Sequence, residues 1–100
     1  PLAGHAVYGM AKAALRMLTK GLALDLAPEV RVNAIAPGAI LWPDSGKSAE
    51  AQAALLSRVP MGRIGTPDDI AAAVAWLAGA DAGYVTGQVL RVDGGRGIGG

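Results

Sequence analysis

The spacing of hydrophobic residues changes along the chain between a helical period and a strand period. Residues 7–27 are rich in alanine, leucine, methionine and lysine and predict a long helix that ends before Pro28. Residues 30–36, VRVNAIA, alternate at their start and are rich in valine and isoleucine, so they predict a strand that ends at Pro37-Gly38. Residues 39–47 follow as a loop, and residues 48–58 predict a second helix with Ser48 as its N-cap.

A third helix has a clear start signal. Thr66 is the expected N-cap, Pro67 occupies the first helical position, and Asp69 stands where a capping-box acid belongs. Gly79 fits a C-cap. Residues 87–95, GQVLRVDGG, then predict a last strand. The helical period of the third helix places four apolar side chains on its buried face: Ile70, Ala73, Val74 and Leu77.

The order of elements predicts an α/β sheet with helices packed against it. Only two strands are present, whereas typical sheets have about five or six. We therefore expect the remaining strands to lie upstream of Pro1. Residues 1–95 are predicted to be the C-terminal portion of one domain, and the glycine-rich residues 96–100 a flexible tail.

The first helix has an unusually wide apolar sector. Five side chains form its polar sector, and roughly 220° of the remaining circumference is apolar except for Asp25. A helix that covers one core needs a stripe only slightly wider than about 100°. We expect this helix to contact both its own sheet and a partner, although alanine-rich faces also tolerate water. The polar sector holds Tyr8, Lys12, Arg16, Thr19 and Lys20.

Composition narrows the function classes. The 100 residues are 52% hydrophobic and 17% charged, which excludes disorder and suggests the interior of a larger protein. The net charge is +1 without a basic run, which argues against nucleic acid, and no apolar run reaches the length of a membrane span. There is no cysteine and only one histidine, His5, so we expect no metal site and a cytoplasmic protein.

Tyr8 and Lys12 are the first candidates for chemistry. Residues four apart on a helix lie on the same face, with their Cβ atoms about 5–6 Å apart. An ammonium group at that distance lowers the pKa of a tyrosine from about 10, so that the phenol can exchange a proton near neutral pH. The lysine can also donate a hydrogen bond to a ribose. The alternative is a surface tyrosine packed on a lysine stem.

Pro37-Gly38 ends the first strand. In doubly wound sheets ligands bind outside the carboxyl ends of the strands, and a glycine there allows close approach to the backbone. A simple turn is the alternative. For Asn33 we favour a structural role, as a polar side chain satisfied by backbone groups.

Four segments in this order resemble the short-chain dehydrogenase/reductase family. They are YGMAKAAL, RVNAIAPG, RVPMGRIGTPDDIAAAVAWLA and YVTGQVLRVDGG, and they cover most of the chain. The resemblance implies the C-terminal part of a Rossmann-type doubly wound parallel sheet and NAD(P)-dependent hydride transfer. It implies that Tyr8 is the catalytic acid/base and that Lys12 lowers its pKa and binds the nicotinamide ribose.

The resemblance also implies further contacts. Beside the nicotinamide it places Pro37, Gly38, Ala39 and Ile40. It makes the helix at 7–27 and the last strand subunit contacts of a dimer or tetramer.

Within the family, GHAVY, PGAILWP and DGGR are most similar to bacterial pteridine reductases. Many family members have a threonine shortly after Pro-Gly, and here Leu41 and Trp42 lie in that region, as candidate substrate contacts. This departure favours a pterin as the small-molecule substrate, NADPH as the cofactor, and Trp42 stacked on a flat ring. A loop aromatic that plugs the domain is the alternative for Trp42.

Two essential parts of such an enzyme are expected before Pro1: the glycine-rich turn that holds the dinucleotide phosphates, and a further catalytic serine or aspartate. Other readings remain open. One is a short-chain reductase that acts on a ketone or a 3-oxoacyl substrate. The other is a truncated, non-catalytic chain that keeps only the dimerising helix. Under the enzyme reading as well, we expect activity from the intact protein and not from these 100 residues alone.

Overall fold

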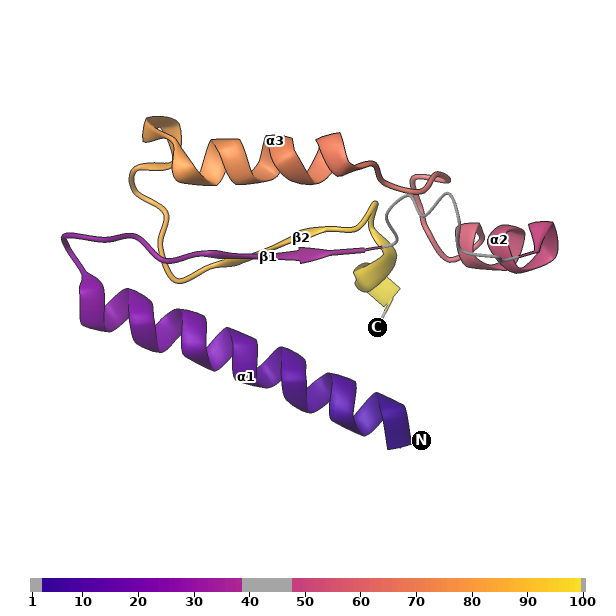
Figure 1. The fold of residues 1–100 in the computed structure, drawn as a ribbon, viewed down its shortest axis with the longest axis horizontal. Coiled ribbons are helices and arrows are strands. Elements are labelled where there is room, and N and C mark those ends of the chain that lie inside the picture. The colour runs from indigo at the N-terminus through magenta and orange to yellow at the C-terminus, as the bar shows by residue number, and fades with distance from the viewer. Residues whose placement is uncertain (1–2, 39–47, 100) are drawn as a thin grey trace. The chain divides into compact units, whose positions relative to one another are not determined.

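The computed structural model describes residues 3–38 and 48–99 of the chain (Figure 1). The predicted order of helices and strands is confirmed, and two short 3₁₀ helices, η1 and η2, are added to it. In chain order the elements are α1 (Ala3–Leu26), β1 (Ala34–Pro37), α2 (Ala49–Leu56), α3 (Pro67–Ala78), η1 (Ala80–Ala82), β2 (Val89–Val92) and η2 (Arg96–Gly99).

The chain forms two compact units. Unit 1 comprises Pro1–Ala34 and Leu77–Leu90, and unit 2 comprises Ile35–Trp76 and Arg91–Gly100. Unit 1 therefore holds all of α1, the last two residues of α3, and η1. Unit 2 holds α2, most of α3 and the C-terminal residues.

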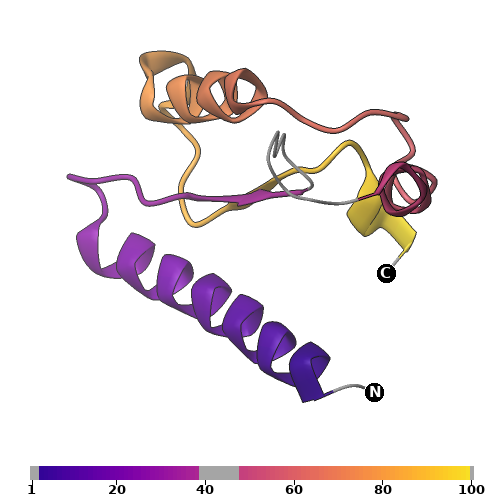
Figure 2. The ribbon, with the colours of Figure 1, turned by 45° about the vertical axis from the view of Figure 1, so that its right-hand side comes forward.

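The two strands pair in parallel. The N–H of Ala34 donates to the carbonyl of Gln88 at 2.9 Å, and the N–H of Gly38 donates to the carbonyl of Val92 at 3.0 Å. Both partners advance by four residues, so the strands run in the same direction, as the α/β prediction requires. Figures 1 and 2 show β1 and β2 side by side.

The core of unit 1 is built from small side chains. Thr19 and Ala23 of α1 are buried, with exposed fractions of 4% and 5%, and Ala82 is completely buried. A Cβ atom on Gly87 would lie 3.5 Å from the Cβ of Ala23, so α1 approaches the residues before β2 closely at this point. The Thr19 hydroxyl donates to the carbonyl of Leu15 at 2.7 Å, which satisfies it inside its own helix.

Arg31 ties the end of α3 to the chain before β1. Its guanidinium donates to the carbonyls of Leu77 at 2.8 Å, Val85 at 3.2 Å and Gly79 at 3.2 Å. A cation at this position also complements the negative end of the helix dipole.

Asn33 joins the chain at the start of β1 to the chain at the start of β2. Its amide donates to the carbonyl of Val85 at 3.0 Å, and its side-chain oxygen accepts from the N–H of Gln88 at 3.1 Å. The expectation that backbone groups satisfy Asn33 is confirmed.

The predicted starts of α2 and α3 are confirmed. Ser48 caps α2, its hydroxyl accepting from the N–H of Ala51 at 3.1 Å. At α3 the Thr66 hydroxyl accepts from the N–H of Asp69 at 3.2 Å, and the Asp69 carboxylate accepts from the N–H of Thr66 at 2.8 Å. This reciprocal pair is a capping box.

Two details at α3 differ from the prediction. Val74 is 47% exposed, whereas Leu77 is buried and Ile70 and Ala73 are partly buried. The buried stripe is therefore narrower than the apolar periodicity indicated. Gly79 follows the helix but has a φ of −87° and a ψ of 172°, so it is extended and forms no left-handed cap. Arg31 instead donates to the carbonyl of Leu77 in the last turn of α3 and to that of Gly79 just after the helix.

The exposure of α1 reverses part of the sequence interpretation. Thr19, which the sequence places in the polar sector, is buried. It forms the packed stripe of the helix together with Ala23, and both side chains are small. The apolar sector of α1 is instead exposed. Met10, Met17 and Leu24 repeat every seven residues and are 72%, 70% and 80% exposed.

The end of the chain forms a turn followed by η2. The Asp93 carboxylate accepts from the N–H groups of Gly95 at 2.9 Å and Gly97 at 3.0 Å. Flexibility of residues 96–100 stays a prediction. In the described part of the chain, no helix is long and apolar enough to cross a membrane.

Candidate functional site

Tyr8 and Lys12 both lie in α1, one helical turn apart, as predicted. The side chain of Tyr8 lies outside the described structure, whereas that of Lys12 is described and exposed. Positions 8 and 12 fall within about 60° of positions 19 and 23 on a helix of 3.6 residues per turn. The candidate pair thus occupies the same stripe of α1 that unit 1 buries further along at Thr19 and Ala23.

Pro37 and Gly38 lie at the carboxyl end of β1, in unit 2, as predicted. The close approach at Gly38 is to Asp93. A Cβ atom on Gly38 would lie 2.6 Å from the Cβ and 2.7 Å from the Cα of Asp93. The glycine is therefore required by the packing of the two strand ends, a reason that the sequence interpretation did not contain.

The remaining predicted site residues lie outside the described part of the chain. They are Ala39 and Ile40, predicted beside the nicotinamide, and Leu41 and Trp42, predicted at the substrate. Their roles stay predictions.

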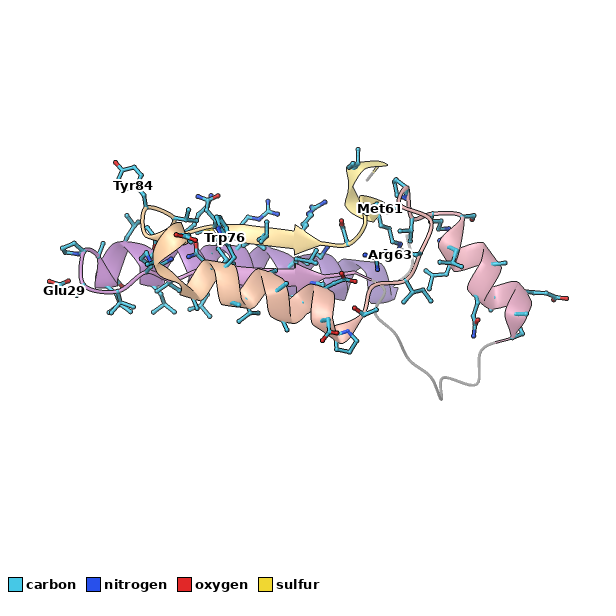
Figure 3. All side chains as sticks on the ribbon, turned by 90° about the horizontal axis from the view of Figure 1, so that it is seen from above. Glu29, Met61, Arg63, Trp76 and Tyr84 are labelled. Carbon is cyan, nitrogen blue, oxygen red and sulfur yellow. The ribbon has the colours of Figure 1, made fainter. Side chains whose placement is uncertain are left out.

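Unit 2 contains a cavity that the sequence interpretation missed. It has a volume of about 420 Å³ and lies at the carboxyl end of β2. Figure 3 labels two residues of its lining, Met61 and Arg63, beside the yellow C-terminal segment. The described residues that line it are Met61, Arg63, Gly65, Asp69, Arg91, Val92, Asp93, Gly94 and Gly95.

Two of these glycines are needed for the shape of the cavity. Gly94 and Gly95 have φ values of 63° and 92°, which side-chain-bearing residues rarely adopt. A Cβ atom on Gly94 would also meet the Cγ1 of Val59 at 2.8 Å. The Asp-Gly-Gly sequence after β2 therefore permits a tight turn over Val59, one of the few buried apolar residues.

Arg63 and Asp69 form a two-point ion pair at the cavity. The guanidinium Nη1 lies 2.9 Å from one carboxylate oxygen and Nη2 lies 3.3 Å from the other. The hydrogen bond from Arg63, and to a smaller extent the one from the N–H of Thr66, holds the pKa of Asp69 well below its usual range. The same pairing raises the pKa of Arg63. Asp69 thus stays ionised and serves α3 and Arg63 together.

The sequence carried a partial signal for this cavity. Asp69 was predicted as a capping residue, but a spacing of six residues to Arg63 has no special meaning in a loop followed by a helix. Arg91 lies on the exposed side of β2, where a basic residue has many uses. The cavity was missed because it depends on how the loop after α2 meets the turn after β2.

The residues present fit a nicotinamide cofactor by their chemistry. A phenol and an ammonium group one turn apart offer a proton donor and a hydrogen-bond donor for ribose hydroxyls. Pro37-Gly38 stands at the strand end where such ligands bind in α/β sheets. In the part of the chain that the structure describes, no cluster of three or more His, Cys, Asp or Glu side chains is placed to hold a metal ion.

A family model and several known proteins match most of this chain. A family model described as enoyl-(acyl carrier protein) reductase matches residues 2–96. The chain is 50% identical over 99 residues to 3beta-hydroxysteroid dehydrogenase 1 of Eggerthella lenta, covering 95% of this chain and 38% of that protein. It is 44% identical over 94 residues to 3-oxoacyl-(acyl-carrier-protein) reductase FabG of Thermotoga maritima, covering 92% of this chain and 38% of that protein.

The fold agrees with a solved structure. A short-chain dehydrogenase/reductase mutant of Serratia marcescens matches with a TM-score of 0.83 and 43% identity, covering 96% of this chain and 40% of that one. The α/β fold predicted from the sequence is thereby confirmed. The chain spans about two fifths of the length of these relatives. With residues 2–96 matched, the chain belongs to the short-chain dehydrogenase/reductase family.

Proposed function

We propose that the protein carrying this chain is an NAD(P)-dependent oxidoreductase that interconverts a carbonyl and an alcohol, with Tyr8 as the acid/base. The observation that carries the proposal is the position of Tyr8 and Lys12, one turn apart on a single stripe of α1. Membership of an oxidoreductase family supports it. So do the names of the relatives, which include a hydroxysteroid dehydrogenase and a 3-oxoacyl reductase.

In this mechanism Tyr8 and Lys12 have separate tasks. When bound, the nicotinamide supplies or accepts the hydride at the carbonyl carbon. The Tyr8 hydroxyl donates a proton to the carbonyl oxygen during reduction, and the Tyr8 phenolate accepts the proton of the alcohol during oxidation. The Lys12 ammonium lowers the pKa of the phenol by its charge and donates hydrogen bonds to the ribose.

Pro37 and Gly38 position the cofactor in this proposal. They stand at the carboxyl end of β1, and the contact of Gly38 with Asp93 fixes that end against β2. Ala39 and Ile40 follow them in sequence and complete the proposed contact with the nicotinamide. We propose NADPH over NADH, and titration of the intact protein with both cofactors tests the choice.

A pterin ring is the second candidate substrate. It is favoured by the segments GHAVY, PGAILWP and DGGR, and by Leu41 and Trp42 in place of the usual threonine. The relatives given above are other members of the family, so they support the carbonyl substrate more directly.

A substrate panel separates the two candidates. Oxidation of NADPH or NADH by the intact protein is measured with a 3-keto steroid, a 3-oxoacyl thioester and an oxidised pterin. Turnover of a ketone or thioester supports the main proposal. Turnover of the pterin alone supports the second. Binding of neither cofactor contradicts both and favours a non-catalytic chain.

We also propose that the protein is a homo-oligomer, a dimer or tetramer, which associates through α1 and the last strand. The support is the exposed apolar repeat of Met10, Met17 and Leu24, since surfaces of this kind on a helix are commonly covered by a partner.

A further inference from the structure

The cavity at the carboxyl end of β2 is not used by the proposed proton transfer. Its lining brings two guanidinium groups, Arg63 and Arg91, and two carboxylates, Asp69 and Asp93, to one space of about 420 Å³. Ligand-binding cavities usually have volumes of about 300–1,000 Å³. The cavity is therefore large enough for a charged group with several attached atoms.

The two carboxylates are already satisfied by hydrogen bonds from this chain. The Asp93 oxygens accept from the N–H groups of Gly95 and Gly97. The Asp69 oxygens accept from Arg63 and from the N–H and hydroxyl of Thr66. These hydrogen bonds, at the turn and at the helix start, occupy much of the acceptor capacity of both carboxylates.

The arginines are less fully used. The side-chain hydrogen bond described for Arg91 runs from Nη1 to the carbonyl of Gly97 at 3.0 Å, whereas a guanidinium has five N–H donors. A Cβ atom on Gly97 would collide with Arg91 Nη1, so this glycine makes room for the guanidinium beside the turn. Arg63 is half-exposed although it is paired with Asp69. The cavity therefore offers a ligand hydrogen-bond donors, chiefly those of Arg91.

We propose that this cavity binds a small oxyanion, the phosphate or carboxylate group of a ligand, through Arg91 with assistance from Arg63. The guanidinium fork matches such a group with two parallel hydrogen bonds. The cavity lies at the strand end where α/β sheets bind ligands, next to the contact between Gly38 and Asp93. The proposal goes beyond hydride transfer and does not require it.

The experiment measures binding of inorganic phosphate and of acetate to the intact protein by titration calorimetry, without cofactor or substrate. We expect saturable binding that weakens as salt is added, because the interaction is largely electrostatic. The change R91Q should weaken it about tenfold or more, the scale of a lost charge-assisted pair. R91K should retain part of the affinity, since lysine keeps the charge without the fork.

A matched control separates the cavity from general surface charge. Arg58 is exposed, lies in the same unit and does not line the cavity, so R58Q removes the same charge elsewhere. We expect R58Q to bind both anions as the unchanged protein does. Tighter binding of phosphate or of acetate identifies the preferred group. No saturable binding of either anion, or an equal loss in R58Q and R91Q, overturns the proposal, while cofactor binding and turnover are judged separately.

Discussion

Gly38 shows how a single residue position links the two strand ends. The space that a side chain would occupy is taken by the Cα and Cβ of Asp93, at 2.7 and 2.6 Å from an added Cβ atom. A glycine after a strand is easily taken as a turn or a ligand contact, and the sequence offered no sign that Asp93 is its neighbour. Contacts between residues 55 positions apart depend on the strand register, which local patterns do not fix.

Replacement of Gly38 by alanine is expected to destabilise the protein by about 1–3 kcal/mol, the scale of an overpacked site. The free energy of unfolding is measured by urea denaturation. Gly9 is the control, because an added Cβ atom there has nothing within 4 Å. Gly9→Ala should be neutral or stabilising in a helix. Equal effects of the two changes would contradict the packing account.

At the scale of elements, the start of α3 was predictable because its signals are local. Thr66 and Asp69 are three residues apart and bond to each other's backbone N–H. The end of the same helix was not predictable in this way. Gly79 suggested a left-handed cap, but Arg31, 46 residues before Leu77, donates to the carbonyls of Leu77 and Gly79 at this end of the helix.

The start of α3 should lose stability in acid. Asp69 has a lowered pKa in the folded protein, whereas an unfolded aspartate titrates near about 3.9. Its contribution is therefore present above about pH 4 and is lost as the pH falls toward the lower folded value. We expect Asp69→Asn to be less stable than the unchanged protein near neutral pH. The difference should shrink as the pH falls below about 4.

Urea midpoints measured across this pH range test the prediction. Asp68 lies in the same first turn without the capping hydrogen bonds described for Asp69, so Asp68→Asn is the control. A stability difference for Asp69→Asn that is independent of pH would show that the lowered pKa has no energetic consequence.

The open face of α1 illustrates a limit of helical periodicity. The wide apolar sector was visible in the sequence, but the stripe that packs in unit 1 is that of Thr19 and Ala23, which are small rather than strongly apolar. Close packing against Gly87 selects small residues. The large apolar side chains of α1 lie outside this packed stripe and are exposed.

The double change Met17→Glu with Leu24→Glu is expected to dissociate the proposed oligomer, because it buries two carboxylates in an apolar contact. The mass of the intact protein in solution is measured by sedimentation equilibrium. Arg58→Glu, an exposed change outside α1 and the last strand, should leave the mass unchanged. An unchanged mass for the double variant would place the subunit contact elsewhere.

For the whole molecule, the sequence was sufficient to predict the family and the class of fold. Both follow from four ordered segments, and both are confirmed by the family model and by the Serratia marcescens structure. The parts that were not predicted arise where segments distant in sequence meet, as at the cavity lined by Arg63, Arg91 and Asp93. The chain spans about two fifths of the length of its relatives. The activity of the whole protein is therefore a proposal, and the role of Tyr8 is its central claim.

Turnover of the intact protein carrying Tyr8→Phe tests that proposal most directly. The change removes one hydroxyl, and Tyr84→Phe is the matched control, since Tyr84 is fully exposed and points away from the ribbon in Figure 3. We predict that Tyr8→Phe lowers kcat by about 10²-fold or more, the scale of a lost general acid, while cofactor binding persists and Tyr84→Phe retains full activity. Unchanged turnover in Tyr8→Phe would contradict the assignment of Tyr8 as the proton donor.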